Sequence, residues 1–209
     1  MANPDNRFGW RPVRTLSGAA LPIVRCYVSA SYATALYVGD PVDIDTTATN
    51  RANGVRVPTV IASGMTDGTY QVGIITAFEP DPTGLNRIYR PASTARYCQV
   101  CLGTPDVVFE IRDDGGVVLT NTAIGANAVG IATHSGDTTT GLSGFELDSG
   151  TTTAPSGNAS NTMIIIGCAD KPDNAWDGST DTRMVWEVML CNWRYLIGSA
   201  YGALGVLAA

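Results

Sequence analysis

The sequence predicts an all-β fold: a compact β-sandwich or barrel-like domain with extended N-terminal and C-terminal arms. Two observations support this prediction. Short runs rich in β-branched residues, which are typical of strands, occupy residues 23–28, 35–38, 41–44, 55–62, 71–78, 96–102, 107–112 and 163–167. Turn-forming groups stand between these runs, and they are Gly39-Asp40, Asn53-Gly54, Asp67-Gly68, Pro80-Asp81-Pro82, Asp114-Gly115-Gly116 and Lys171-Pro172-Asp173.

Residues 1–18 form the predicted N-terminal arm, because they are polar, contain prolines and show neither a helical nor a strand period. The arm carries Phe8, Trp10, Arg11 and Arg14, and Trp and Arg are frequent among residues that dominate protein interfaces. These four residues are therefore candidate contacts with a neighbouring subunit. The alternative is that Phe8 and Trp10 fold back against their own domain.

The β-rich core is expected to span residues 19–192. Within it, residues 125–162 form an excursion rich in Thr, Gly and Ser, which is either a long ordered segment or a mobile loop. Residues 144–148 alternate as a strand would. Residues 184–190 are predicted as the final strand, because Trp186, Val188 and Leu190 share one face at a period of two.

Residues 193–209 are expected to form an apolar C-terminal arm that contributes Trp193, Tyr195, Leu196 and Tyr201 to subunit contacts. A terminal strand packed in the core is the alternative, because exposed apolar tails favour aggregation. This segment is shorter than the roughly 20 residues that span a bilayer, and the first residues lack the features of a secretory signal. We therefore expect no membrane partner and synthesis in a cytoplasm.

The charge composition indicates which partners to expect. The formal net charge of −6 argues against a nucleic-acid partner, since phosphate binding requires clustered Lys and Arg. Only 15% of the residues are charged, and twelve of the thirteen cations are Arg, a residue suited to pairing at protein interfaces. The composition favours a protein that contacts other proteins, although a lineage bias towards Arg would give the same count.

Catalytic motifs are scarce. His134 is the single histidine and Lys171 the single lysine, so the usual groups for proton transfer and Schiff-base chemistry are few. The run from His134 to Asp137 contains the residue types of a hydrolase triad, but members of a triad must converge in space rather than follow one another along a chain. We expect a structural protein, not an enzyme, without a cofactor.

The five cysteines are an odd number, so they do not all pair within one chain. Cys98 and Cys101 have the spacing of metal knuckles and redox motifs. In a strand over 96–102, however, residues three apart point to opposite faces, so the two sulfur atoms would not share a metal ion. Cys168 and Cys191 are too far apart in sequence to supply a second close pair. We expect buried, unreactive thiols and no metal site.

Several sequence blocks together suggest a family. They are residues 9–14 (GWRPVR), 27–42 (YVSASYATALYVGDPV), 89–97 (YRPASTARY), 106–111 (DVVFEI) and 134–145 (HSGDTTTGLSGF). In these blocks the chain resembles capsid cement, or decoration, proteins of tailed bacteriophages. The resemblance covers most of the chain up to residue 148 and again residues 185–190.

The resemblance implies a β-rich homo-oligomer, a trimer in preference to a dimer, that binds the outer surface of the mature capsid. Its partner would be the major capsid protein, whose neighbouring subunits it would cement after synthesis in the bacterial cytoplasm. Two alternatives share the composition: a tail-tube protein, and a receptor-binding or carbohydrate-binding module that uses Trp10, Trp176 or Trp193 against sugar rings. If residues 1–14 are a free arm, deleting them should leave a folded core that binds capsids much more weakly.

Overall fold

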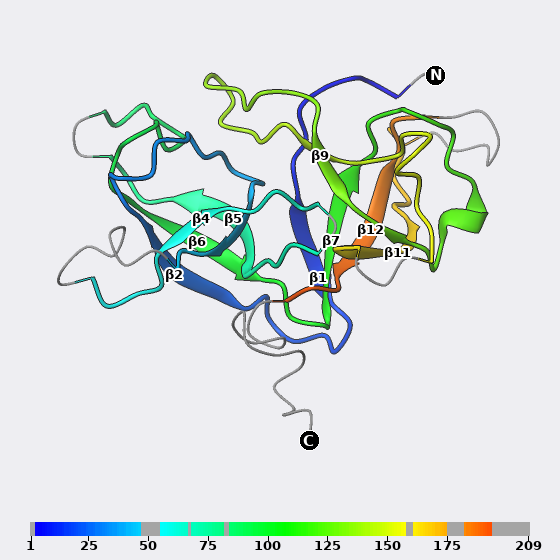
Figure 1. The fold of residues 1–209 in the computed structure, drawn as a ribbon, viewed down its shortest axis with the longest axis horizontal. Coiled ribbons are helices and arrows are strands. Elements are labelled where there is room, and N and C mark those ends of the chain that lie inside the picture. The colour runs from blue at the N-terminus through cyan, green and yellow to red at the C-terminus, as the bar shows by residue number, and fades with distance from the viewer. Residues whose placement is uncertain are drawn as a thin grey trace.

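Two antiparallel sheets lie side by side in the computed structural model (Figure 1). The structure describes residues 3–46, 55–66, 68–81, 84–157, 161–174 and 182–193. The first sheet has the order β1-β7-β12-β11-β8, with β1 Arg11–Thr15, β7 Val107–Arg112, β12 Val185–Leu190, β11 Met163–Cys168 and β8 Asn127–Ala128. The second has the order β2-β6-β5-β3-β4, with β2 Ile23–Val28, β6 Arg96–Leu102, β5 Gly73–Phe78, β3 Pro41–Ile44 and β4 Val60–Ala62.

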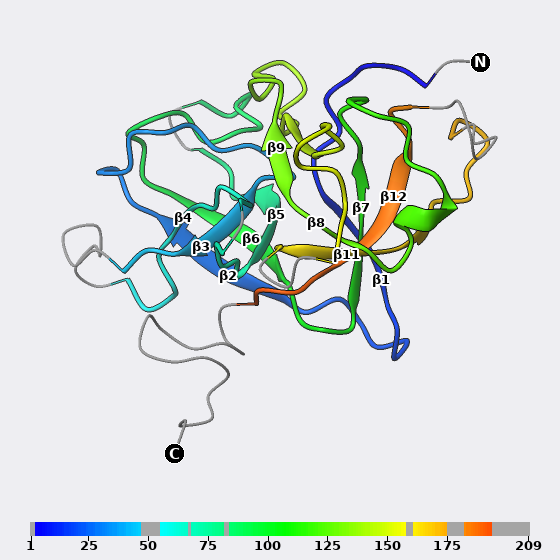
Figure 2. The same cartoon turned by 45° about the vertical axis from the view of Figure 1, so that its right-hand side comes forward.

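A separate antiparallel pair joins β9 Gly130–Ala132 to β10 Phe145–Leu147, and β9 lies between the two larger sheets in Figure 2. A single turn of 3₁₀ helix spans Asn121–Ala123. The predicted all-β, sandwich-like fold is confirmed. Within the described residues, no helix is long and apolar enough to cross a bilayer.

The first sheet buries the larger core. Alternate residues of β7 and β12 face it, among them Phe109, Ile111, Trp186 and Val188. The predicted common face of Trp186, Val188 and Leu190 is confirmed, because all three are buried in this core.

The second sheet buries a smaller core of aliphatic residues and thiols on one face. Cys26, Cys98 and Val100 belong to it, whereas Cys101, on the opposite face of β6, belongs to the first core. The predicted separation of Cys98 and Cys101 onto opposite faces is therefore confirmed. Cys98 instead lies opposite Cys26 of β2.

The described part of the N-terminal segment, residues 3–18, packs into the fold, whereas the sequence predicts an extended arm over residues 1–18. Residues 11–15 form β1, which pairs with β7 in the first sheet. Trp10 is 1% exposed, and its ring meets the Phe109 ring edge to face at a centroid distance of 5.9 Å. Its backbone N–H donates to the Gly39 carbonyl at 3.1 Å. The sequence of β1 shows no period of two because a bulge between Pro12 and Arg14 interrupts the alternation of residues between the two faces of the strand.

Phe8 is also buried, at 8% exposure, in a small cluster with Ala169 and Val185. Three cations surround its ring, with the Arg11 guanidinium 3.9 Å, the Arg112 guanidinium 5.2 Å and the Lys171 ammonium 6.0 Å from the centroid. The fold-back alternative is thus correct for both Phe8 and Trp10.

The excursion over 125–162 contributes strands β8, β9 and β10, so the ordered alternative holds for its described residues 125–157 and 161–162. The expected strand over 144–148 is present as β10, and the final strand as β12. The expected strand over 35–38 is absent: Leu36 and Val38 make only isolated bridges, to Arg90 and Leu142. Of 55–62, only Val60–Ala62 forms a strand.

Arg90 explains why the segment around Leu36 does not extend into a sheet. Its guanidinium is fully buried and donates to the carbonyls of Ser29, Tyr32, Thr34 and Thr94 at 2.5–2.7 Å. These carbonyls are therefore held by a side chain rather than by a neighbouring strand, which curls the chain into a loop.

Two more arginines hold the backbone in the same way. Arg96 donates to the carbonyls of Glu79, Arg87 and Tyr89, and Arg112 donates to Pro4. From the sequence, the excess of Arg over Lys favours contacts with other proteins. For these residues the structure gives a different reason: the planar five-donor guanidinium satisfies several carbonyls at once, which an ammonium does not do in a fixed geometry.

Candidate functional site

The structure does not gather the contact residues expected from the sequence into one exposed surface. Phe8 and Trp10, expected as partner contacts, are buried within their own domain and do not lie on its surface. Arg14 is exposed but pairs with Glu187 of β12 at 2.7 Å. Trp193 is half-buried, and its indole N–H donates to the Val72 carbonyl at 3.1 Å. The remaining expected contacts, Tyr195, Leu196 and Tyr201, lie outside the described residues, as do both alternatives for the C-terminal segment beyond residue 193.

A different surface has the composition of an interface. It lies on the outer face of the second sheet and consists of Arg25, Tyr27, Glu79 and Tyr97, which we call the outer-face patch. Tyr27 lies opposite Tyr97 in the β2–β6 register, with their ring centroids 5.2 Å apart. The Arg25 guanidinium stacks 3.8 Å from the centroid of Tyr97 and forms a two-pronged ion pair with Glu79, at 2.5 and 2.8 Å.

The ion pair orders the patch. The hydrogen bond from Arg25 lowers the pKa of Glu79, so this carboxylate stays charged under mildly acidic conditions. The paired Arg25 is held flat on Tyr97, and its side chain remains about half exposed. Tyr and Arg held rigidly at a surface lose little conformational entropy when a partner binds, which is why these residue types dominate interfaces.

The alternation of residues along β2 already indicates part of this surface. In β2, Ile23, Arg25 and Tyr27 alternate with Val24, Cys26 and Val28, and only the second set faces the smaller core. An alternation of this kind places an aromatic residue and an arginine together on the solvent face of a strand. The cross-strand neighbours Tyr97 and Glu79 were not predictable, because they depend on the register.

Strand β1 stands at the end of its sheet's order, so one of its edges has no neighbouring strand in the described sheets. Strand β2 also ends its sheet, but its outer edge is partly occupied, because the Tyr27 N–H donates to the Pro58 carbonyl at 2.9 Å and Tyr27 bridges Thr59. Exposed apolar side chains accompany these edges: Val13 on β1, Leu16 after it, and Ile23 at the start of β2. Leu16 is 58% and Ile23 50% exposed. An open strand edge with apolar side chains can pair with another chain.

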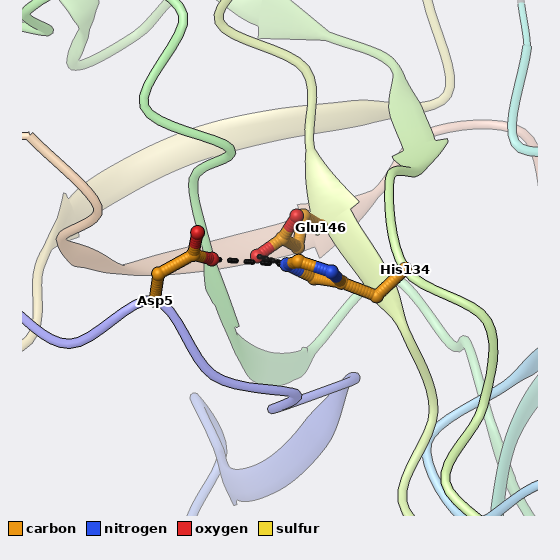
Figure 3. Close-up of side chains that lie close together, drawn as sticks. All are labelled: Asp5, His134 and Glu146. Carbon is orange, nitrogen blue, oxygen red and sulfur yellow. Dashed lines mark hydrogen bonds and ion pairs between the residues drawn. The ribbon is translucent and has the colours of Figure 1, made fainter.

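A second cluster joins the N-terminal segment to the β9–β10 hairpin. Asp5, His134 and Glu146 come together there, with His134 two residues beyond β9 and Glu146 in the middle of β10 (Figure 3). The His134 Nε2 atom lies 2.9 Å from the Asp5 Oδ1 atom and 3.9 Å from the Glu146 Oε1 atom. Arg183 also pairs with Asp5, at 2.5 Å.

The environments of the two carboxylates differ. Asp5 is exposed, whereas Glu146 is 1% exposed, and burial raises the pKa of Glu146. One Glu146 oxygen accepts a hydrogen bond from the Thr133 hydroxyl. The other, Oε1, is buried and has no hydrogen-bond partner among the described residues. Sequence reasoning missed this cluster, because its three members are separated by up to 141 residues.

A pocket of about 470 Å³ lies beside β9, and its lining mixes apolar residues such as Val129 and Ile131 with hydroxyls and the Asp148 carboxylate. Its walls include Thr66, Asp148, Thr153 and Asn161, and no aromatic side chain of the described residues lines it. The carbohydrate-binding alternative expected tryptophans in a cleft. Trp10 is buried in the core and Trp193 is tied to Val72, while Trp176 lies outside the described residues.

Burial makes the thiols of Cys26, Cys98 and Cys101 unreactive. Burial raises the pKa of Cys26 and of Cys101 to about 11, and it raises the pKa of Cys98 further. Since the thiolate is the reactive and metal-binding form, these three cysteines are largely protonated at neutral pH. The interpretation of Cys98 and Cys101 as packing residues agrees with their positions.

No protein-family model matches the sequence, and a search of curated proteins finds none that is significantly similar to it.

Proposed function

We propose that this protein is a capsid cement protein, which binds the outer surface of a mature bacteriophage capsid and links neighbouring subunits of the major capsid protein. The observation that carries the proposal is the outer-face patch. It offers a stacked arginine and two tyrosines at the edge of a sheet, on a chain whose surface charge is low. The sequence blocks that resemble cement proteins support the same role.

The proposed mechanism is stabilisation by mass action. A protein that binds only the mature lattice stabilises that lattice by its binding free energy, and the effect accumulates over many copies. In a homo-oligomer, a trimer in our proposal, binding of one patch raises the effective concentration of the others near the shell. The open edge of β1, with Val13 and Leu16 exposed beside it, is the proposed contact between copies, and in a trimer it would meet a different surface of the next copy, because a three-fold ring requires heterologous contacts.

Co-sedimentation of the purified full chain with expanded capsids tests the proposal. The Arg25→Ala variant removes both the ion pair with Glu79 and the stacking on Tyr97. We expect it to bind capsids roughly tenfold or more weakly than the parent protein, as for a central interface arginine.

Arg87→Ala is the matched control, because Arg87 is similarly exposed and also pairs with a carboxylate, that of Asp81 at 3.3 Å, but lies outside the patch. Equal loss of binding in both variants would contradict a specific role for the outer-face patch. Failure of the parent protein to bind capsids would reject the cement proposal, and electron cryo-microscopy of the virion would then show whether the protein lies in the tail tube or at a receptor-binding tip.

A further inference from the structure

We propose that Asp5, His134 and Glu146 form a binding site for a divalent transition-metal ion, with Zn²⁺ as the best-suited ion, which ties the N-terminal segment to the β9–β10 hairpin. The three ligand atoms lie within 4.8 Å of one another. In a tetrahedral zinc site with bonds of roughly 2.0–2.1 Å, ligand atoms are about 3.3 Å apart. The observed separations from His134 Nε2, 2.9 and 3.9 Å, bracket this value.

The buried oxygen of Glu146 is an independent reason to expect a ligand. Its Oε1 atom is aimed at the cluster and has no hydrogen-bond partner among the described residues (Figure 3). A buried carboxylate oxygen without a partner is costly, and a cation bound beside it would remove that cost. The other oxygen is held by Thr133, so the carboxylate is already oriented towards His134.

The positions of the other two ligands are also supported. Gly144 allows the chain before β10 to approach His134 closely, since a Cβ atom at this position would overlap the His134 carbonyl. Arg183 holds Asp5 and balances one of the two carboxylate charges, and Arg112 interacts electrostatically with Glu146. These cations lower the affinity for a metal ion, so we expect a site weaker than one made of three histidines.

The ligand types select the metal. One imidazole nitrogen and two carboxylate oxygens suit Zn²⁺ and its first-row neighbours, whereas Ca²⁺ and Mg²⁺ prefer sites made wholly of oxygen. Binding requires the lone pair of His134 Nε2, so the imidazole proton must reside on Nδ1. The hydrogen bond between His134 and Asp5 is then replaced by two bonds to the metal ion.

The single histidine makes the test direct. Its ring resonances in an NMR spectrum belong to one residue, so they report on this site alone. We expect Zn²⁺, added to the metal-free full chain, to shift the His134 ring resonances and saturate at one equivalent. Ca²⁺ at the same concentration should leave them unchanged.

Asp5→Asn removes one ligand at an exposed position and should weaken Zn²⁺ binding by about tenfold or more, measured by calorimetry. His134→Gln should abolish the saturable binding. Asp173→Asn, which alters an exposed carboxylate on another loop, is the control and should bind like the parent protein. Zn²⁺ binding that leaves the His134 resonances in place, or that is equally strong in Asp5→Asn and the parent protein, would overturn the proposal.

Discussion

The two sheets are built from very different parts of the chain. Every strand of the second sheet lies between Ile23 and Leu102, so that sheet is a continuous piece of sequence. The first sheet combines β1, at residues 11–15, with strands that begin only at Val107. The second sheet is thus an insertion between the first two strands of the other. One core is local in sequence, while the other depends on a strand and a tryptophan from the far end of the chain.

This difference changes what a truncation would do. Removing residues 1–14 would take away Trp10 and most of β1, so it would damage the first core rather than trim an arm. From the structure we therefore expect such a deletion not to leave an intact core. A loss of capsid binding by that protein would not separate interface loss from unfolding, and point variants are needed instead.

Among the variants that compare the two cores, a replacement of Trp10 should lower the free energy of unfolding most. We expect Trp10→Ala to lower the free energy of unfolding by about 3–5 kcal/mol, as for a large aromatic residue removed from a packed core. Leu36→Ala, in the smaller core, should cost about 2–5 kcal/mol. Denaturant unfolding followed by far-ultraviolet circular dichroism measures both.

Leu16→Ala, at an exposed position, should change that free energy by less than about 0.5 kcal/mol. If Trp10→Ala were as mild as Leu16→Ala, Trp10 would not belong to the first core. A single transition in both core variants would show that the two sheets unfold together, and two transitions would show that the inserted sheet unfolds separately.

Gly9 and Gly39 are in close contact where the N-terminal segment meets the chain of the second sheet. A substitution there should cause the next largest loss in the free energy of unfolding. Gly39 has a φ of +94°, and a Cβ atom there would lie 3.0 Å from the Gly9 Cα atom and 3.0 Å from the Trp10 nitrogen. Gly39→Ala should therefore cost about 2–5 kcal/mol, from backbone strain together with overpacking.

Gly18→Ala isolates the steric part of that cost. Gly18 has a similar φ of +73°, but nothing lies within 4 Å of its added Cβ atom. We expect this variant to lose only about 1–2 kcal/mol, the cost of the left-handed conformation. Equal losses for the two glycines, in the same unfolding measurement, would mean that the crossing of the two segments is not tight.

Asp40, beside that crossing, should make stability depend on pH. It is buried, and burial raises its pKa from 3.8 to about 6, although the Tyr37 N–H donates to its carboxylate at 2.7 Å. The folded state then binds the proton more strongly than the unfolded state, so this group lowers stability as the pH rises from about 4 to about 6. A pKa difference of this size corresponds to at most about 3 kcal/mol.

The Asp40→Asn variant should lack this component. The measurement is the free energy of unfolding of both proteins at pH 4 and pH 7, with the difference between the proteins isolating Asp40 from the other carboxylates. A difference that grows in favour of the parent protein towards pH 7 would have the wrong sign and would contradict a raised pKa.

The smallest stability effects are expected on the outer faces. Arg14→Ala, on the first sheet, and Arg25→Ala, on the second, each remove an exposed ion pair, and such pairs contribute little to folding. Neither should measurably shift the midpoint of thermal unfolding. A marked shift for Arg25→Ala would mean that its stacking on Tyr97 holds the sheet together, and weaker capsid binding by this variant would then need another explanation.

Features that depend on residues close together in the sequence could be predicted, and features that depend on distant residues could not. The inward faces of β12 and β6 could be predicted because alternation within one strand shows them. Strand β1 could not, since its pattern is broken by a bulge and its partner lies about 100 residues away. The site residues show the same limit: Phe8 and Trp10 are typical of interfaces by residue type, but only the three-dimensional structure shows that one packs on Phe109 and the other among three cations.

The insertion of one sheet into the other also has a temporal consequence during synthesis. Arg11 of β1 pairs with Glu110 of β7, so β1 leaves the ribosome about 100 residues before its partner. At about 5–20 residues per second, this delay lasts roughly 5–20 s. Near the end of that interval, once Leu102 has emerged, the inserted sheet can complete itself, while Trp10 still lacks Phe109, the ring on which it packs. The nascent chain is therefore most prone to misassociation just before Val107 emerges, a stage at which a chaperone that shields the N-terminal segment would have its greatest effect.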